Sequence, residues 1–171
     1  QKAMDAGHNT STPRDYFCYA TMLQMNKQGY FPYTPPMTLL RGLRASIDMM
    51  NAEGLDNVFK RHTRLASGVR AAVTAWGLKN CAVDRKWHSD TVTAIRVSEN
   101  IDANDVIKTA YYSYGVSLGA GMGPLNGNVF RIGHLGWLNE TMVLQALGGV
   151  EMAMRDVGIR FLPGCGVGAA I

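Results

Sequence analysis

The sequence predicts an α+β fold in which a small mixed or antiparallel sheet of three to four strands carries its helices on one face. The chain has 171 residues, 47% of them apolar, which suits one globular domain or one and a half smaller units. Two long stretches with helical periodicity come before residue 77, and short β-branched segments alternate with helical stretches after residue 91. A short connection between two of these strands requires antiparallel pairing.

The first 33 residues mix Asn, Ser, Thr, Pro and aromatic residues without clean periodicity. We expect only a short helix around Tyr16–Gln28 there and interpret residues 1–33 as a connection between domains. Thr34 is a good N-cap residue, and prolines are tolerated in a first helical turn, so the pattern predicts a helix over 35–52. Its apolar stripe consists of Leu40, Leu43, Ile47 and Met50.

A second, longer helix is predicted over 55–76, with Gly77 at its C-terminal end. Its outer face carries Lys60, Arg61, Arg64 and Arg70. We interpret this basic row as a solvated helix face; a polyanion-binding site is the alternative.

The remaining elements follow in the order β-α-β-β-α. Strands are predicted for 91–97, Val116–Leu118 and 129–134, a helix over 103–114 capped by Asp102, and a helix over 139–157. The Gly-rich tail after residue 158 suits a surface strand or coil. The expected core consists of Leu43, Ile47, Val58, Val69, Val106, Val143, Leu147 and Val150.

Composition excludes several classes of protein. The net charge is +4, but the basic residues are scattered, so no nucleic-acid partner is predicted. No stretch approaches the ~18 consecutive apolar residues of a membrane span, and the N-terminal segment has no secretory apolar core, so we expect a cytoplasmic protein without a membrane partner. The cysteines are odd in number and widely spaced, which predicts reduced thiols: Cys18, Cys81 and Cys165.

The histidines do not show the i, i+4 pairs or Cys/His sets that hold a metal, and no metal site is predicted; they are His8, His62, His88 and His134. We interpret His134 as a structural residue whose side chain faces away from that of Arg131. The glycines of SLGAGMGPLNGN precede a strand rather than a helix, which favours a flexible strand connection over a phosphate-binding loop.

Two places carry candidate chemistry. Arg131 lies mid-strand in VFRIGH, where a guanidinium is costly unless it meets a carboxylate or phosphate; the alternative is an internal salt bridge with Glu140 or Glu151. Thr34 opens a helix beside several tyrosines in GYFPYTPP, so its hydroxyl and the backbone N–H groups are a plausible phosphate contact. The alternative there is an N-cap with a hydrophobic staple.

A family resemblance rests on six segments that occur in order: GYFPYTPP, LLRGLRASIDMMNAEGLDNVFKRHTRLA, AWGLKNCA, TVTAIRV, SLGAGMGPLNGNVFRIGHLG and ALGGVEMAMRDVG. Together they resemble the C-terminal part of class V, fold-type I aminotransferases, with the strongest similarity to serine–glyoxylate aminotransferases. The resemblance extends over residues 10–170. It implies a transferase that binds pyridoxal 5'-phosphate and moves an amino group from serine or alanine to glyoxylate.

The resemblance also assigns roles to residues. Arg131 would bind the substrate α-carboxylate, as the family's R-I-G arginine does, and Thr34 would reach the coenzyme phosphate of the neighbouring subunit, with Tyr33 or Tyr30 beside it. A homodimer or higher homo-oligomer acting on small amino acids and 2-oxo acids is therefore expected. Trp137 departs from the family, which has a smaller or polar residue there.

The family's large domain, with the lysine that carries the coenzyme, lies upstream of this sequence. Residues 1–33 would then be a connection and remnant of that domain, and 34–171 the small domain. We expect no catalytic residue in this chain, treat Lys2 as a surface lysine, and expect the isolated chain to be inactive and not to retain the coenzyme. The alternative function is a non-catalytic ligand-binding or interaction module with the same fold; an RNA-binding domain ranks last.

Overall fold

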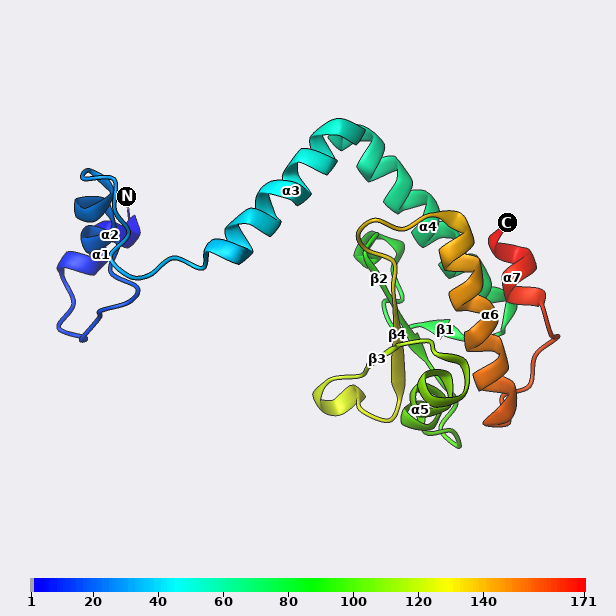
Figure 1. The fold of residues 1–171 in the computed structure, drawn as a ribbon. Helices are drawn as coiled ribbons and strands as arrows, with labels where there is room; N and C mark the ends of the chain where they lie inside the picture. The colour runs from blue at the N-terminus through cyan, green and yellow to red at the C-terminus, as the bar shows by residue number, and fades with distance from the viewer. Residues whose placement is uncertain (1) are drawn as a thin grey trace. The chain divides into compact units, whose positions relative to one another are not determined.

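The computed structural model describes residues 2–171, except the side chain of His8, and divides into two compact units (Figure 1). The first ends at Ala52 and contains α1 (Lys2–His8), α2 (Tyr19–Asn26) and most of α3 (Met37–Glu53). The second runs from Glu53 to Ile171 and contains the sheet with its helices. The predicted division into 1–33 and 34–171 stays a prediction.

The third helix begins two residues later than predicted. The Leu40 N–H donates to the Pro36 carbonyl at 3.0 Å, so Pro36, and not Thr34, occupies the cap position of α3. The reason is the proline pair: a residue that precedes proline is disfavoured in the helical region, which excludes both Thr34 and Pro35 from the helix. The helix expected around Tyr16–Gln28 is present as α2, and α1 has no counterpart in the predicted elements.

The apolar stripe of α3 is not part of the core. No residue of α3 is buried, and Leu43 and Ile47 are 55% and 39% exposed. Their assignment to the core was wrong, because helical periodicity identifies an apolar face without identifying what covers it.

The second unit is organised around α4 (Leu55–Ala75), which follows a break at Gly54, where φ is +85°. One face of α4 is buried against the sheet and includes Val58, Leu65, Val69 and Val73. The helix ends before Gly77, whose φ of +72° is typical of the residue after a helix. No helix among the described residues is long and apolar enough to cross a membrane.

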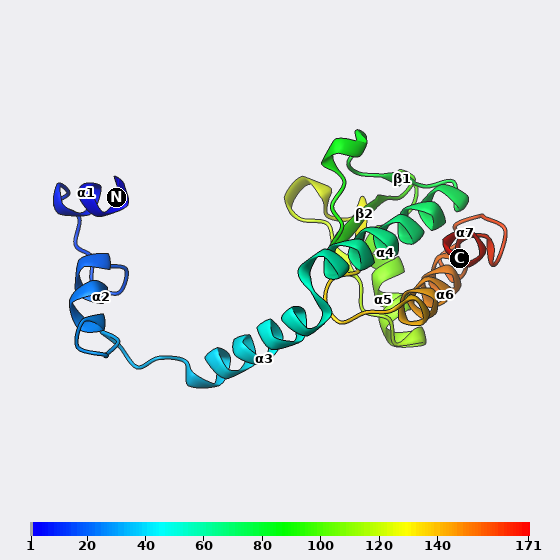
Figure 2. The ribbon, with the colours of Figure 1, turned by 90° about the horizontal axis from the view of Figure 1, so that it is seen from above.

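The sheet has four antiparallel strands in the order β1-β2-β4-β3. They are β1 (Lys79–Asn80), β2 (Val92–Arg96), β3 (Gly119–Ala120) and β4 (Val129–Gly133). The helix α4 lies alongside β1 and β2 (Figure 2). Ile95, Phe130 and Ile132 belong to the core that the helices form on one face. The intervening residues Ala94 and Arg131 are paired with each other and lie on the opposite face. The α+β prediction is confirmed.

The strand expected at Val116–Leu118 lies instead at Gly119–Ala120. Val116 donates its N–H to the Ala110 carbonyl at 2.9 Å and so completes the end of α5 (Ala103–Tyr114). Val116 and Leu118 also pack against the core. These apolar residues therefore terminate and cover a helix, and the strand begins only where they end.

The tail after residue 158 is not a strand or coil throughout, because α7 (Cys165–Ala170) forms there. Its N-terminus is fixed by Glu151 of α6 (Glu140–Asp156). The Glu151 carboxylate accepts bonds from the backbone N–H groups of Gly164 at 2.7 Å and Gly166 at 2.8 Å, and from the Trp76 indole at 2.9 Å. These bonds lower the pKa of Glu151 although burial alone would raise it.

Candidate functional site

Arg131 lies on the face of the sheet that the helices do not cover. Its Nε donates to the Ala120 carbonyl at 2.9 Å, and its cross-strand neighbours are the small residues Ala94 and Gly119. Within residues 2–171 the two terminal nitrogens of the guanidinium have no hydrogen bond or ion pair. They form a planar two-point donor of the kind that recognises a carboxylate.

The salt bridge considered as an alternative for Arg131 is not formed. Glu140 pairs with Arg64, and Glu151 accepts its bonds from Trp76 and the start of α7. The strand arginine therefore has no internal carboxylate partner in the described part of the chain.

Other cations share the face with Arg131. Arg96 lies two residues from Ala94 on β2, and its cross-strand partner on β1 is Lys79. Both side chains are exposed, and no ion pair involves either of them within the described residues. The four strands contain no Asp or Glu, so this face of the sheet is positively charged and favours an anion.

His134 is buried at the end of β4 on the core side. Its Nδ1 is 3.1 Å from the Asp90 carbonyl, which can only accept, so Nδ1 carries the proton. Its Nε2 then accepts from the Thr93 hydroxyl at 2.9 Å. Burial lowers the pKa of His134 and keeps the ring neutral. Both nitrogens are satisfied, in agreement with the structural role predicted for it.

The loop after β4 is fixed by two residues of α4. Arg61 binds Glu53 through two nitrogens, at 2.7 and 2.8 Å, and donates to the carbonyls of Gly136 and Leu138 at 2.8 and 3.0 Å. His62 accepts from the Gly136 N–H at 3.1 Å.

The solvated-face interpretation of the basic row therefore holds only in part. Arg61 and Arg70 are mostly buried, with 16% and 18% of their side chains exposed, and Arg70 donates to the Ser89 carbonyl at 3.1 Å. The sequence contains no signal for these bonds, because their partners lie far along the chain.

Trp137, the residue that departs from the resemblance, lies in this loop and is 67% exposed. The Arg61 guanidinium carbon is 5.7 Å from the centre of its ring, within the range of a cation–π contact. Glu53, Arg61 and Trp137 line one side of an open pocket together with Leu138 and Asn139. The Trp137 ring is therefore held by the same arginine that fixes the loop.

The second candidate segment lies in the first unit. Thr34 is exposed, and its hydroxyl has no hydrogen bond among the described residues. The neighbouring Tyr33 donates its hydroxyl to Asp15, and this bond raises the pKa of Tyr33 to about 12. Tyr33 also stacks on Tyr16, with ring centres 4.8 Å apart. A phosphate contact from Tyr33 would require the bond to Asp15 to break, whereas Thr34 and the exposed Tyr30 are free to donate.

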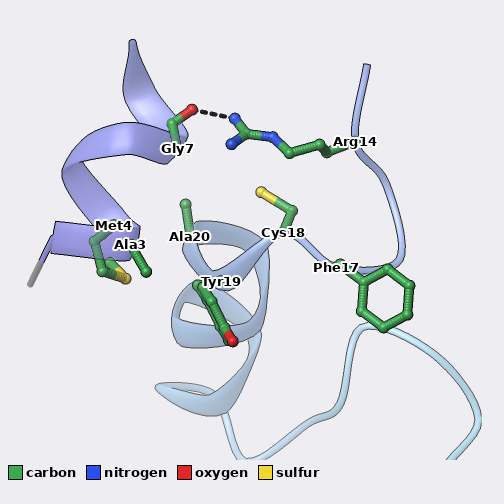
Figure 3. A pocket seen from close by; sticks show the side chains of 8 residues that line it. All are labelled: Ala3, Met4, Gly7, Arg14, Phe17, Cys18, Tyr19 and Ala20. Carbon is green, nitrogen blue, oxygen red and sulfur yellow. Dashed lines mark hydrogen bonds between the residues drawn. The ribbon is translucent and has the colours of Figure 1, made fainter. Parts of the chain in front are cut away.

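A further pocket of the first unit surrounds Cys18 (Figure 3). Arg14 reaches the Gly7 carbonyl there, and a hydrogen bond with Thr21 lowers the pKa of Cys18. All three cysteines are free thiols. Lys2 is exposed on α1, and no group of three His, Cys, Asp or Glu residues within the described chain could hold a metal ion.

Comparison with known proteins finds similar aminotransferases. No family model matches the chain. Serine–glyoxylate aminotransferase from Hyphomicrobium methylovorum is 57% identical over 172 residues, which cover 99% of this chain and 42% of that protein. L-aspartate–glyoxylate aminotransferase from Paracoccus denitrificans is 48% identical over 169 residues, which cover 99% of this chain and 43% of that protein. Over nearly its whole length the chain is similar to class V aminotransferases.

The class V fold is also found among solved structures. Ureidoglycine–glyoxylate aminotransferase from Bacillus subtilis matches with a TM-score of 0.86 at 26% identity, over 96% of this chain and 43% of that one. The chain thus spans less than half the length of these relatives, and the similarity lies in their C-terminal portion. The aminotransferases that it resembles depend on pyridoxal phosphate. The names of the three relatives share glyoxylate and differ in the amino donor.

Proposed function

We propose that the chain is the C-terminal part of a transaminase that moves an amino group from serine to glyoxylate, with alanine as an alternative donor. The observation that carries the proposal is the open guanidinium edge of Arg131 on a sheet face without carboxylates. Serine is proposed because of the 57% identity to a serine–glyoxylate aminotransferase, and glyoxylate because it recurs in the names of the relatives.

In this proposal Arg131 binds and orients the carboxylate that amino-acid and 2-oxo-acid substrates share. Its Nε is already engaged by Ala120, so the carboxylate meets the two terminal nitrogens in one plane. The neighbouring cations Arg96 and Lys79 strengthen the attraction for an anion without occupying the same position. Orientation of the substrate is a large part of what such a residue contributes to catalysis.

Pyridoxal phosphate would supply the electron-accepting ring on which amino-group transfer depends. The residues of GYFPYTPP fit its phosphate at one point, because the Thr34 hydroxyl is exposed and not otherwise bonded. The N–H of Met37 donates to the Pro35 carbonyl at 2.9 Å, and the N–H groups of the next residues in the first turn of α3 lie within a few residues of Thr34 and favour an anion. We propose that Thr34 donates to the phosphate held by a neighbouring subunit, which makes the working enzyme a homodimer or higher homo-oligomer.

The test compares Arg131→Lys with Arg155→Lys in the complete enzyme. Arg155 is exposed on α6, and its ion pair among the described residues is with Asp156, so it serves as the control. A lysine at 131 cannot form the planar two-point contact, and loss of a charged hydrogen bond costs about 1.5–3 kcal/mol, so KM for serine and glyoxylate should rise roughly tenfold or more. Coenzyme affinity should change little in both variants.

Unchanged kinetics in Arg131→Lys would refute the carboxylate role. A complete protein that binds small carboxylates but transfers no amino group would favour the alternative, a non-catalytic ligand-binding module. Absorbance of the coenzyme during single turnover with serine distinguishes the two cases.

A further inference from the structure

We propose that Gly119 is a positioning residue for Arg131: its missing side chain leaves the space in which the guanidinium packs against β3 with two nitrogens open to a carboxylate. The inference rests on the proposed function, because the carboxylate contact is the one assigned there to Arg131. It adds a residue that touches neither substrate nor coenzyme and acts only through the arginine.

The space around residue 119 is filled by the Arg131 side chain. A Cβ added to Gly119 would lie 3.1 Å from Arg131 Nε, 3.3 Å from its Nη2 and 3.3 Å from its Cβ. Ordinary contacts between such atoms are about 3.5–4.0 Å. Because the crowded atoms lie at both ends of the arginine side chain, rotation about one bond does not relieve all three contacts.

The backbone at 119 does not itself require glycine. Gly123 and Gly127 in the same connection have φ values of +54° and +77°, where other residues are strained. Gly119 is not among the residues with positive φ, and it pairs with Arg131 in regular antiparallel register. A glycine inside a strand lowers strand stability and often marks a close approach of another group. The space that the missing side chain leaves for Arg131 therefore explains the glycine at position 119.

The described strands offer Arg131 no second partner that would hold its guanidinium if it were displaced. Its bond from Nε to the Ala120 carbonyl, at 2.9 Å, is the one that orients the guanidinium within the described residues. The strands offer no carboxylate as a substitute partner. A methyl group at 119 would shift the guanidinium by a few tenths of an ångström, weaken this bond and leave the terminal nitrogens less firmly directed.

The placement can be tested in the 171-residue chain without any ligand. The Arg131 Nε–H should exchange with solvent more slowly by NMR than the Nε–H of Arg96, which is exposed and unbonded within the described chain. Gly119→Ala should measurably reduce this protection. Gly133→Ala is the matched control, because Gly133 lies on the same strand and face as Arg131 and a Cβ there meets nothing within 4 Å. Undiminished protection in Gly119→Ala would overturn the inference.

The consequence is tested in the complete enzyme with glycolate, a small carboxylate without an amino or keto group. Gly119→Ala should raise the Kd for glycolate about tenfold, as expected for one lost charged hydrogen bond, and Gly133→Ala should not. In the Arg131→Lys background Gly119→Ala should have no further effect on the Kd, because the residue acts through the guanidinium. Equal effects in both backgrounds would show a role independent of Arg131 and refute the inference.

The outcomes separate the two proposals. If Arg131→Lys leaves glycolate binding unchanged, the proposed function fails, whereas the NMR result still decides the placement. If Arg131→Lys weakens binding and Gly119→Ala does not, only the positioning role fails. If Gly119→Ala does not fold, Arg131→Ala in the same chain should restore folding by removing the crowded group; failure to do so would also refute the inference.

Discussion

The close contact between α7 and Trp76 gives the sharpest stability prediction. Gly166 is fully surrounded: an added Cβ would lie 2.1 Å from the Trp76 Nε1, 2.4 Å from its Cε2 and 2.9 Å from Oε1 of Glu151. Trp76 is only 3% exposed and donates to the same carboxylate, so it cannot move aside. Gly166→Ala must therefore displace α7 by more than about 1 Å to restore ordinary contact distances.

The size of the effect follows from the bonds that this displacement breaks. The N–H groups of Gly164 and Gly166 lie 2.7 and 2.8 Å from the Glu151 carboxylate, and a shift of about 1 Å takes them beyond hydrogen-bonding distance. Each bond to a charged group contributes about 1.5–3 kcal/mol, while alanine gains about 1 kcal/mol of helix propensity. We expect a net loss of about 2–5 kcal/mol in the free energy of unfolding.

Gly168→Ala is the control in the same helix, because a Cβ at 168 meets nothing within 4 Å. This variant should gain only the greater helix propensity of alanine. Thermal unfolding followed by circular dichroism should show Gly166→Ala melting roughly 10 °C below the unchanged chain. Gly168→Ala should melt at the same temperature or slightly above. Equal melting temperatures for the two variants would show that α7 does not pack as described.

Two further predictions concern Glu151 and Thr34. The folded-state pKa of Glu151 is lowered, so its contribution to stability is present above the unfolded pKa of about 4.3 and is lost as pH falls through the folded value. In urea unfolding, Glu151→Gln should therefore be less stable than the unchanged chain at pH 7. Below pH 5 its free energy of unfolding should fall less steeply with pH than that of the unchanged chain. Thr34→Ala in the complete enzyme should weaken coenzyme retention, measured by dialysis and absorbance, and leave KM for glyoxylate unchanged; a changed KM with intact retention would contradict its proposed contact with the phosphate.

Elements whose determinants are local were predictable from the sequence. Asp102 accepts from the Asn104 N–H at 2.8 Å and begins α5 at the expected residue, and Asn139 caps α6 in the same way. The helix α7 was missed because Glu151, which fixes its first turn, lies on another element and resembles any other helical glutamate in the sequence. The burial of Leu43 was predicted wrongly for the converse reason, since periodicity does not say what a helix face meets.

The candidate site likewise contains one residue that the local sequence identifies and one that depends on residues distant in the sequence. Arg131 could be identified from the sequence because a guanidinium among apolar strand residues requires a partner, and this inference needs only the identities of the neighbouring residues. Its role and that of Thr34 stay predictions. Gly119 gave no such signal, because it lies in a connection with several glycines and its partner is defined only by the pairing of β3 with β4.

The fixed position of β4 would allow Arg131, in its proposed role, to recognise a carboxylate by geometry. Phe130 and Ile132 fix one face of the strand in the core, and the bonds of His134 to Thr93 and Asp90 fix its end. The loop beyond is held by Arg61 and His62. With the backbone held in this way, only the side chain of Arg131 is left to move. Its bond to the Ala120 carbonyl and its packing into the space at Gly119 restrict most of that movement. A two-point carboxylate contact requires such a preorganised donor, because a guanidinium free to rotate would lose in ordering entropy much of what the contact contributes.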